Sequence, residues 1–475
     1  MAENVCLNRT CAKSSEFWTL LVLGGLVALG SISAFFYLEH HGHVMTGMNN
    51  QIVWGLPHVF AVFLIVAASG VLNVASIGSV FGKKMYKARA PLSGMLALAM
   101  LAGGLAVLVL DLGRPDRLVV AMTYYNFKSI FALNMIFYNG FFAIVGLYLI
   151  TLMSKNLKHF SKPVGLLAFV WRLALTTATG SIFGFLVARA GYNSALYAPM
   201  FIIYSFAYGL AAFIVVQSVM YKWNNIEVDE RILCRLKNLL AVFVSAGLYF
   251  TAVLHLTNMY FAKQWDFERF LLVDGGIYPV LFWGGQVFLG GILPLLMIFS
   301  PGARKSPPRV FFAALLVVLG GHAQMYVTIV GGQAFPLDLF PGYAETSSFF
   351  DGVAHSYTPS LWEMLLGIGG IAETFIELVE GTIGVGAGAG GLGIGAVEAA
   401  LAELTRAAAG DGNQGQAQRK RAPHRHLPTL VERQTAVQTR LSDQVNRMGI
   451  PARRERRDKA TRSRRACHGW GLRCG

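Results

Sequence analysis

Ten long apolar segments, separated by short polar breaks, dominate the first 395 residues of the chain. Each is long enough to cross a hydrocarbon core of about 30 Å at about 1.5 Å of helix rise per residue. Because backbone polar groups in lipid must be satisfied internally, the pattern predicts helices. The predicted spans are 17–37, 53–81, 91–110, 129–152, 164–188, 196–221, 238–260, 277–299, 309–331 and 360–385.

The composition supports a membrane protein. Of the 475 residues 55% are hydrophobic and only 14% are charged, against about 25% charged residues in soluble domains. The first segment is interpreted as a retained helix, because its roughly 20 apolar residues exceed a signal-peptide core of about 7–15. The predicted fold class is therefore all-α, a polytopic membrane bundle of about ten transmembrane helices.

Basic residues in the short loops predict the orientation of these helices. Lys and Arg gather in the loops after the second, fourth, sixth and eighth spans, whereas loops 38–52 and 332–359 contain none. The positive-inside rule then places both termini in the cytoplasm of a multi-pass protein of the cell inner membrane. Arg114, Arg117 and Lys128 are exceptions on an outer loop, which suggests a specific use for Arg114.

Three regions are predicted. Residues 1–16 form a cytoplasmic tail, 17–395 the ten-helix membrane domain, and 396–475 a basic tail. That tail holds most of the net charge of +15, so the charge does not indicate a nucleic-acid partner. Its Arg, Ala and Gly bias is typical of a disordered segment, and it also fits an out-of-frame reading.

The five cysteines show neither CxxC nor CxxCH spacing. The sequence therefore predicts no iron–sulfur cluster or c-type haem on this chain. His58, His255 and His322 do not form the paired sets of multi-haem cytochromes b, so no b-type haem is expected, and no metal site is predicted.

Asp111 and Arg114 lie at the outer end of the third span, in the run Asp111-Leu112-Gly113-Arg114-Pro115. Their spacing lets them face each other on one helical turn. One interpretation is a proton-accepting carboxylate tuned by a cation. The other is an ion pair that closes a helix, and the pattern alone favours neither.

Further ionisable side chains occur within the spans or beside them, where each is costly in free energy. A single buried histidine usually makes packing contacts, but several in one bundle favour a proton or quinone path. The residues proposed for a proton path are Glu39, Arg172, His255, His322 and Glu363.

The runs Trp54-Gly55-Leu56-Pro57-His58-Val59-Phe60 and 111–115, with Gly70 between them, resemble the NrfD/PsrC family of quinone-interacting membrane subunits. The runs 126–131 and Pro359-Ser360-Leu361-Trp362-Glu363 are similar to the DsrP/HmeB branch, which belongs to the sulfite-reduction-associated Dsr complex. The resemblance covers about residues 15–370.

The resemblance implies a subunit without redox cofactors of its own. It would bind menaquinone or ubiquinone near the outer surface and exchange electrons with a periplasmic iron–sulfur protein, beside other membrane and cytochrome subunits of a Dsr complex. Asp111, Arg114 and His58 would act on the quinone, and Tyr124, Tyr125 and Asn126 would complete its pocket. A quinone exchanges two protons with its two electrons, so a titratable relay is required.

Two alternatives come from other classes of protein. One is a proton- or ion-translocating subunit without a quinone site, which would use the proton-path residues. The other is a passive anchor for the iron–sulfur partner. The protein is in any case expected to be part of an oxidoreductase complex rather than a stand-alone enzyme.

Overall fold

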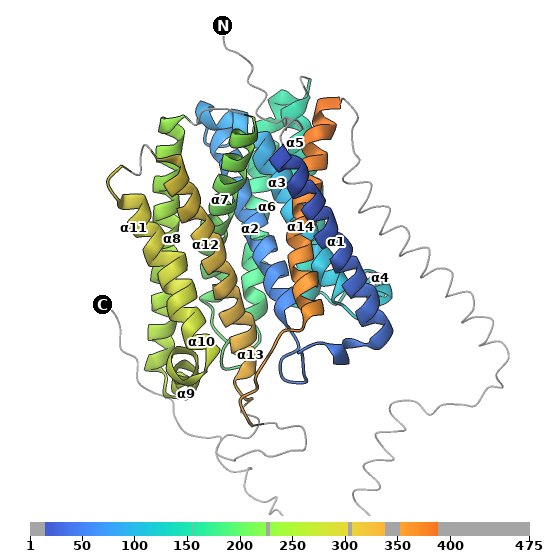
Figure 1. The fold of residues 1–475 in the computed structure, drawn as a ribbon, viewed down its shortest axis with the longest axis vertical. Coiled ribbons are helices and arrows are strands. Elements are labelled where there is room, and N and C mark those ends of the chain that lie inside the picture. The colour runs from blue at the N-terminus through green and yellow to red at the C-terminus, as the bar shows by residue number, and fades with distance from the viewer. Residues whose placement is uncertain (1–14, 155, 225–228, 303–305, 338–351, 388–475) are drawn as a thin grey trace, which may run out of the picture. The chain divides into compact units, whose positions relative to one another are not determined.

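The computed structural model describes residues 15–154, 156–224, 229–302, 306–337 and 352–387. Every regular element in these ranges is helical, as predicted (Figure 1). Nine of the described helices are long and apolar enough to cross a membrane. The fold is therefore an all-α polytopic bundle, which confirms the predicted class. The predicted tail 396–475 lies outside the described residues.

Ten long helical segments match the ten predicted spans. Seven are α1 (Ser15–His41), α2 (Leu56–Ser79), α3 (Ala90–Leu110), α5 (Ile130–Met153), α6 (Ser161–Gly184), α7 (Tyr197–Trp223) and α8 (Glu230–Tyr260). The eighth joins α10 (Ile277–Val280), η7 (Leu281–Ile292) and α11 (Leu293–Phe299). The ninth joins α12 (Pro307–Tyr326), η9 (Val327–Gly331) and α13 (Gly332–Ala334), and the tenth is α14 (Leu361–Ala387).

Short helices fill the connections. They are η1 (His43–Met45), η2 (Lys84–Arg89), η3 (Pro115–Arg117), α4 (Leu118–Thr123), η4 (Lys158–Phe160), η5 (Ala262–Gln264), α9 (Trp265–Arg269) and η6 (Phe270–Asp274). The helices α4, α9 and α13 lie at one end of the bundle, the lower end in Figure 1. We call this the Asp111 end, because α3 finishes there.

Helix boundaries differ from the predicted spans where capping rather than hydropathy sets them. The span predicted to begin at 238 is the end of a longer helix, since α8 begins at Glu230. The Asp229 carboxylate accepts a hydrogen bond from the Arg231 amide and caps this polar first turn. Hydropathy marks only the part of a helix inside the hydrocarbon, so the capped extension was missed.

Helix α2 is the centre of the bundle. It packs on α3 and α7, and also contacts α6, α12 and α14. Gly70 of α2 and Gly209 of α7 let the two backbones touch, because a Cβ on Gly70 would collide with the Ser205 carbonyl. Helix α14 returns to pack against α1 and α3, so the last long helix lies beside the first (Figure 1).

Candidate functional site

Asp111 is the C-cap residue of α3, and its amide donates to the Val107 carbonyl, while the Leu112 amide donates to the Val109 carbonyl. Gly113 follows with a φ of 68°, a left-handed conformation that favours glycine. Pro115 then begins η3. This turn leaves the Asp111 carboxylate only 1% exposed, a costly position for a charged group unless it has a partner.

Two histidines approach this carboxylate from different segments. His58 Nδ1, from the first turn of α2, lies 2.9 Å from Asp111 Oδ2. His43 Nε2, from η1, lies 3.8 Å from Asp111 Oδ1. Both rings are partly exposed, at 22% for His58 and 31% for His43. The carboxylate is thus buried behind two titratable side chains that solvent or a ligand reaches.

None of these groups is satisfied within the described part of the protein. Both Asp111 oxygens, His58 Nδ1 and His43 Nε2 are buried without a hydrogen-bond partner there, because the close contacts lack hydrogen-bond geometry. Buried polar atoms are rarely left in this state. The cluster therefore presents two acceptor oxygens and two ring nitrogens to a small polar group.

An aromatic wall and a polar brace position His58. The Trp54 ring stacks on His58 at a centroid distance of 6.2 Å, and it packs against Phe131, Phe183 and Tyr192 on its other sides. Gln333 of α13 accepts hydrogen bonds from the Val53 and Trp54 amides and donates to the Trp54 carbonyl. These hydrogen bonds fix the segment before α2 to α13.

Glu363 holds the loop that carries His43. Its carboxylate is fully buried and accepts from the Gly47 amide at 2.8 Å, the Ser360 amide at 2.8 Å and the Tyr357 hydroxyl at 2.7 Å. Burial raises the pKa of Tyr357 well above its usual range, and the Glu363 carboxylate raises it further. The phenol therefore keeps its proton, donates to Glu363, and accepts from the Leu56 amide.

Arg114 lies outside α3 and is exposed, whereas Asp111 is buried. The helix ends before Arg114, so the shared helical turn expected for the two residues does not form. Gly113, between the two residues, has a positive φ. His43 and His58 approach Asp111.

The residues proposed to complete the pocket follow α4, at the same end of the bundle. Tyr124 is 83% exposed. Tyr125 stacks on Phe127, and Asn126 accepts a hydrogen bond from the Lys128 amide. Within the described residues, no hydrogen bond, ion pair or ring contact joins these three side chains to Asp111.

The five residues proposed as a proton path have separate surroundings. Glu39 is exposed at the end of α1. The buried Arg172 guanidinium lies between the Phe169 and Phe206 rings and donates to the Ser69 carbonyl. His322 stacks on Phe63. Glu363 holds the loop that carries His43 through the Gly47 amide.

His255 is the fifth of these residues. It contacts Glu268, which the sequence analysis did not single out. The five therefore do not form one connected path through the described residues. Among those residues no group of three or more His, Cys, Asp or Glu side chains is arranged to hold a metal ion.

Comparison with known proteins places the protein in a family. The family described as "Polysulphide reductase, NrfD" matches residues 44–337. The Hdr-like menaquinol oxidoreductase integral membrane subunit of Archaeoglobus fulgidus is 27% identical over 371 residues, which cover 78% of this chain and 93% of that protein. A subunit of the selenate reductase of Mesobacillus selenatarsenatis is 22% identical, covering 74% and 90%. A component of the polysulfide reductase of Wolinella succinogenes is 22% identical, covering 60% and 96%. The chain belongs to the polysulphide reductase NrfD family of integral membrane proteins.

Proposed function

We propose that the protein is the quinone-interacting membrane subunit of a redox complex and that Asp111 is the centre of its quinone site. The observation that carries the proposal is the buried carboxylate whose two oxygens have no hydrogen-bond donor within the described residues. A quinol has hydroxyl groups that can donate to these oxygens, and the neighbouring His43 and His58 rings can accept a proton. Three relatives are named as parts of reductases or oxidoreductases, one of them for menaquinol.

Oxidation of a quinol to a quinone releases two protons and two electrons. Asp111 accepts the proton of one hydroxyl through Oδ2, and the adjacent His58 ring accepts a second. The ring of Trp54 stacks on His58 and keeps water from that side of it. The electrons leave to an iron–sulfur protein docked at the Asp111 end, which we propose faces the periplasm, with both chain termini in the cytoplasm.

We also propose which quinone the protein binds and to which complex it belongs. A menaquinol is favoured by the name of the Archaeoglobus relative, and a link to sulfur metabolism by the polysulfide reductase relative. The Dsr complex is the proposed setting on the sequence resemblance of 126–131 and 359–363. No redox cofactor is assigned to this protein.

The test is Asp111→Asn in the purified redox complex. Loss of the proton acceptor is expected to lower the rate of quinol oxidation by about 100-fold, while the subunits remain assembled. Asp266→Asn is the matched control, because Asp266 is an exposed carboxylate on α9, at the same end of the bundle. A normal rate in Asp111→Asn overturns the quinone role of this site.

A second measurement separates a redox subunit from a passive anchor. A quinone analogue is titrated into the isolated protein by following tryptophan fluorescence, with Trp54 as the reporter beside His58. Saturable binding that Asp111→Asn weakens is expected. If the intact protein does not bind the analogue, the proposal is wrong and the passive-anchor alternative is favoured.

A further inference from the structure

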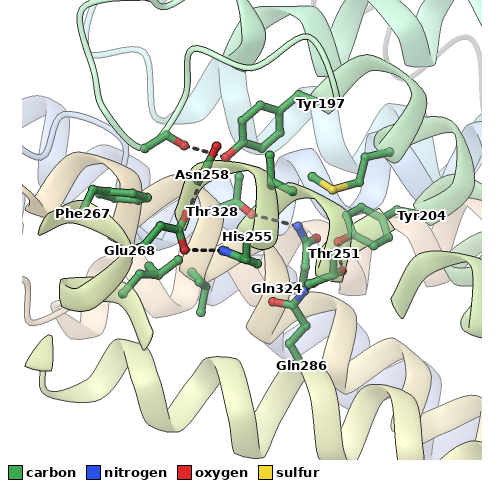
Figure 2. A pocket seen from close by; sticks show the side chains of 15 residues that line it. Tyr197, Tyr204, Thr251, His255, Asn258, Phe267, Glu268, Gln286, Gln324 and Thr328 are labelled. Atoms are coloured by element: carbon green, nitrogen blue, oxygen red, sulfur yellow. Dashed lines mark hydrogen bonds and ion pairs between the residues drawn. The ribbon is translucent and has the colours of Figure 1, made fainter. Parts of the chain in front are cut away.

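A second histidine–carboxylate pair lies in the other half of the bundle. His255 Nδ1 of α8 is 2.7 Å from Glu268 Oε2 of α9, and Asn258 Nδ2 donates to Glu268 Oε1 at 2.7 Å. Figure 2 shows both contacts, with the Glu268 carboxylate pointing at the His255 ring. Glu268 is 1% exposed and His255 13%, so this pair is more enclosed than His58 and Asp111.

The short helix α9 places Glu268 inward although it belongs to a polar connection. Phe267, beside it, is 3% exposed and packs edge-on against Phe335. The neighbouring Asp266 and Arg269 remain exposed, and Arg269 pairs with Asp274. One carboxylate of this helix is thus turned into the protein while its flanking charged residues stay at the surface.

No Lys or Arg lines the cavity around this pair, within the described part of the protein. The other titratable groups that line this cavity are His255, Tyr197 and Tyr204. The Tyr197 hydroxyl donates to the Gly191 carbonyl, and the Tyr204 hydroxyl is bonded to Thr251. A buried carboxylate needs a partner charge or a proton. Because the partner is a histidine and not a permanent cation, the charge state of the pair changes when it gains or loses a proton.

Two small cavities lie near this pair, and they share three lining residues. The first, next to His255 and Glu268, has a volume of about 20 Å³, and the second has about 30 Å³. Each has room for one or two water molecules, for which about 10–15 Å³ is the minimum. Both are lined by Tyr204, Thr251 and Gln286, so they follow one another along α8.

The polar lining continues on one face of α8. Thr251 lies one turn from His255 and shares hydrogen bonds with Tyr204 and Gln286. Gly247, one further turn along, borders the second cavity. From His255 to Gly247 the helix rises about 12 Å, so hydroxyl and amide groups reach towards the middle of the bundle.

Two π-helical segments contribute to the walls of these cavities. The π-helical segment η7 contributes Gln286 to both cavities, and η9 contributes Val327 and Thr328 to the first. π-Helical turns in long helices occur often at functional sites. Gly290 and Gly320 bring η7 and α12 close together, because a Cβ on Gly290 would lie 2.7 Å from the Gly320 Cα.

We propose that His255 and Glu268 form a second proton-exchange site, which takes up and releases one proton through water in the two cavities and is separate from Asp111. Its ligand is a proton carried by water. The loaded state of the pair holds one proton more than the empty state. No electron moves at this site.

The test is infrared difference spectroscopy of the full-length protein in lipid nanodiscs, recorded as the pH is changed. The wild-type protein is expected to show a carboxyl band from Glu268 that titrates and shifts in D₂O. Glu268→Gln removes this band. Asp266→Asn is the matched control on the same helix. It removes an exposed carboxylate and is expected to retain the Glu268 band.

A second variant keeps the carboxylate and removes its partner. His255→Gln is expected to move the titration midpoint of the Glu268 band by at least one pH unit, a tenfold change in proton affinity. The proposal is overturned if Glu268→Gln retains the band, or if His255→Gln leaves its midpoint in place. Asp111→Asn retains the Glu268 band in either case, so failure of the quinone proposal is recognised separately.

Discussion

Replacing Glu363 tests how the site near Asp111 is positioned. Glu363→Ala removes the acceptor of three hydrogen bonds, from the Gly47 amide, the Ser360 amide and the Tyr357 hydroxyl. Each buried donor left unsatisfied costs about 1 to 3 kcal/mol, so three give about 3 to 9 kcal/mol. Water entering the vacated space brings the expected loss towards the lower end, about 3 to 4 kcal/mol.

Glu363→Gln is the matched variant. Its amide oxygen still accepts from the two backbone amides, but its NH2 group replaces the oxygen that accepts from the Tyr357 hydroxyl. We therefore expect a loss of about 2 kcal/mol, the cost of one unsatisfied buried donor. Thermal unfolding in detergent measures both variants. The expected order of melting temperatures is wild type, then Gln, then Ala.

The same change is expected to loosen the loop that carries His43, since Gly47 lies four residues beyond it. Hydrogen–deuterium exchange should rise over residues 43–56 in Glu363→Ala and stay unchanged in α8. Equal melting temperatures for all three proteins, or exchange that rises throughout the bundle, would refute the role of Glu363 as a clamp for this loop.

Two glycine substitutions probe the same architecture. In Gly113→Ala the left-handed backbone costs about 1 to 2 kcal/mol, and the new Cβ lies 3.0 Å from the His43 ring. The affinity for a quinone analogue should therefore fall about five- to tenfold. The control Gly82→Ala has a similar φ of 70° with open space around it, and it should keep the affinity. In Gly70→Ala the methyl group collides with the Ser205 carbonyl, so α2 and α7 separate and the yield of folded protein in a membrane-extraction assay should drop sharply, whereas Gly146→Ala meets nothing within 4 Å and should be stable to within about 1 kcal/mol. Normal yield of Gly70→Ala, or lost affinity in Gly82→Ala, would contradict these accounts.

The residues that gather round Asp111 were only partly predictable. His58 was identified from its place in the 54–60 run, and the structure brings it to 2.9 Å from Asp111. His43 was not among the predicted site residues, since nothing in the sequence shows that its ring turns towards Asp111. Gln333 and Arg189 were missed, because they act on the backbone. Gln333 accepts from the Val53 amide, and Arg189 donates to the Gln51 and Gln333 carbonyls. That role has no sequence pattern.

Glu268 was also missed, because of its place in the sequence. It lies in a polar connection, where a carboxylate is normally solvated, so its position indicated a loop. The short helix α9 turns it inward to 1% exposure. A pattern-based interpretation also joined Glu39, Arg172, His255, His322 and Glu363 in one path, although each has its own surroundings in the structure.

The sequence by itself determined the class of the fold and the positions of the ten long helices. Each helix in lipid satisfies its own backbone hydrogen bonds, so apolar length alone is enough to locate it. The tertiary structure decided which polar side chains meet, because the rotation and packing of each helix depend on contacts such as Gly70 with Ser205 that are far apart in the sequence. The pairing of Asp111 with His58 and His43, and of Glu268 with His255, follows from that packing.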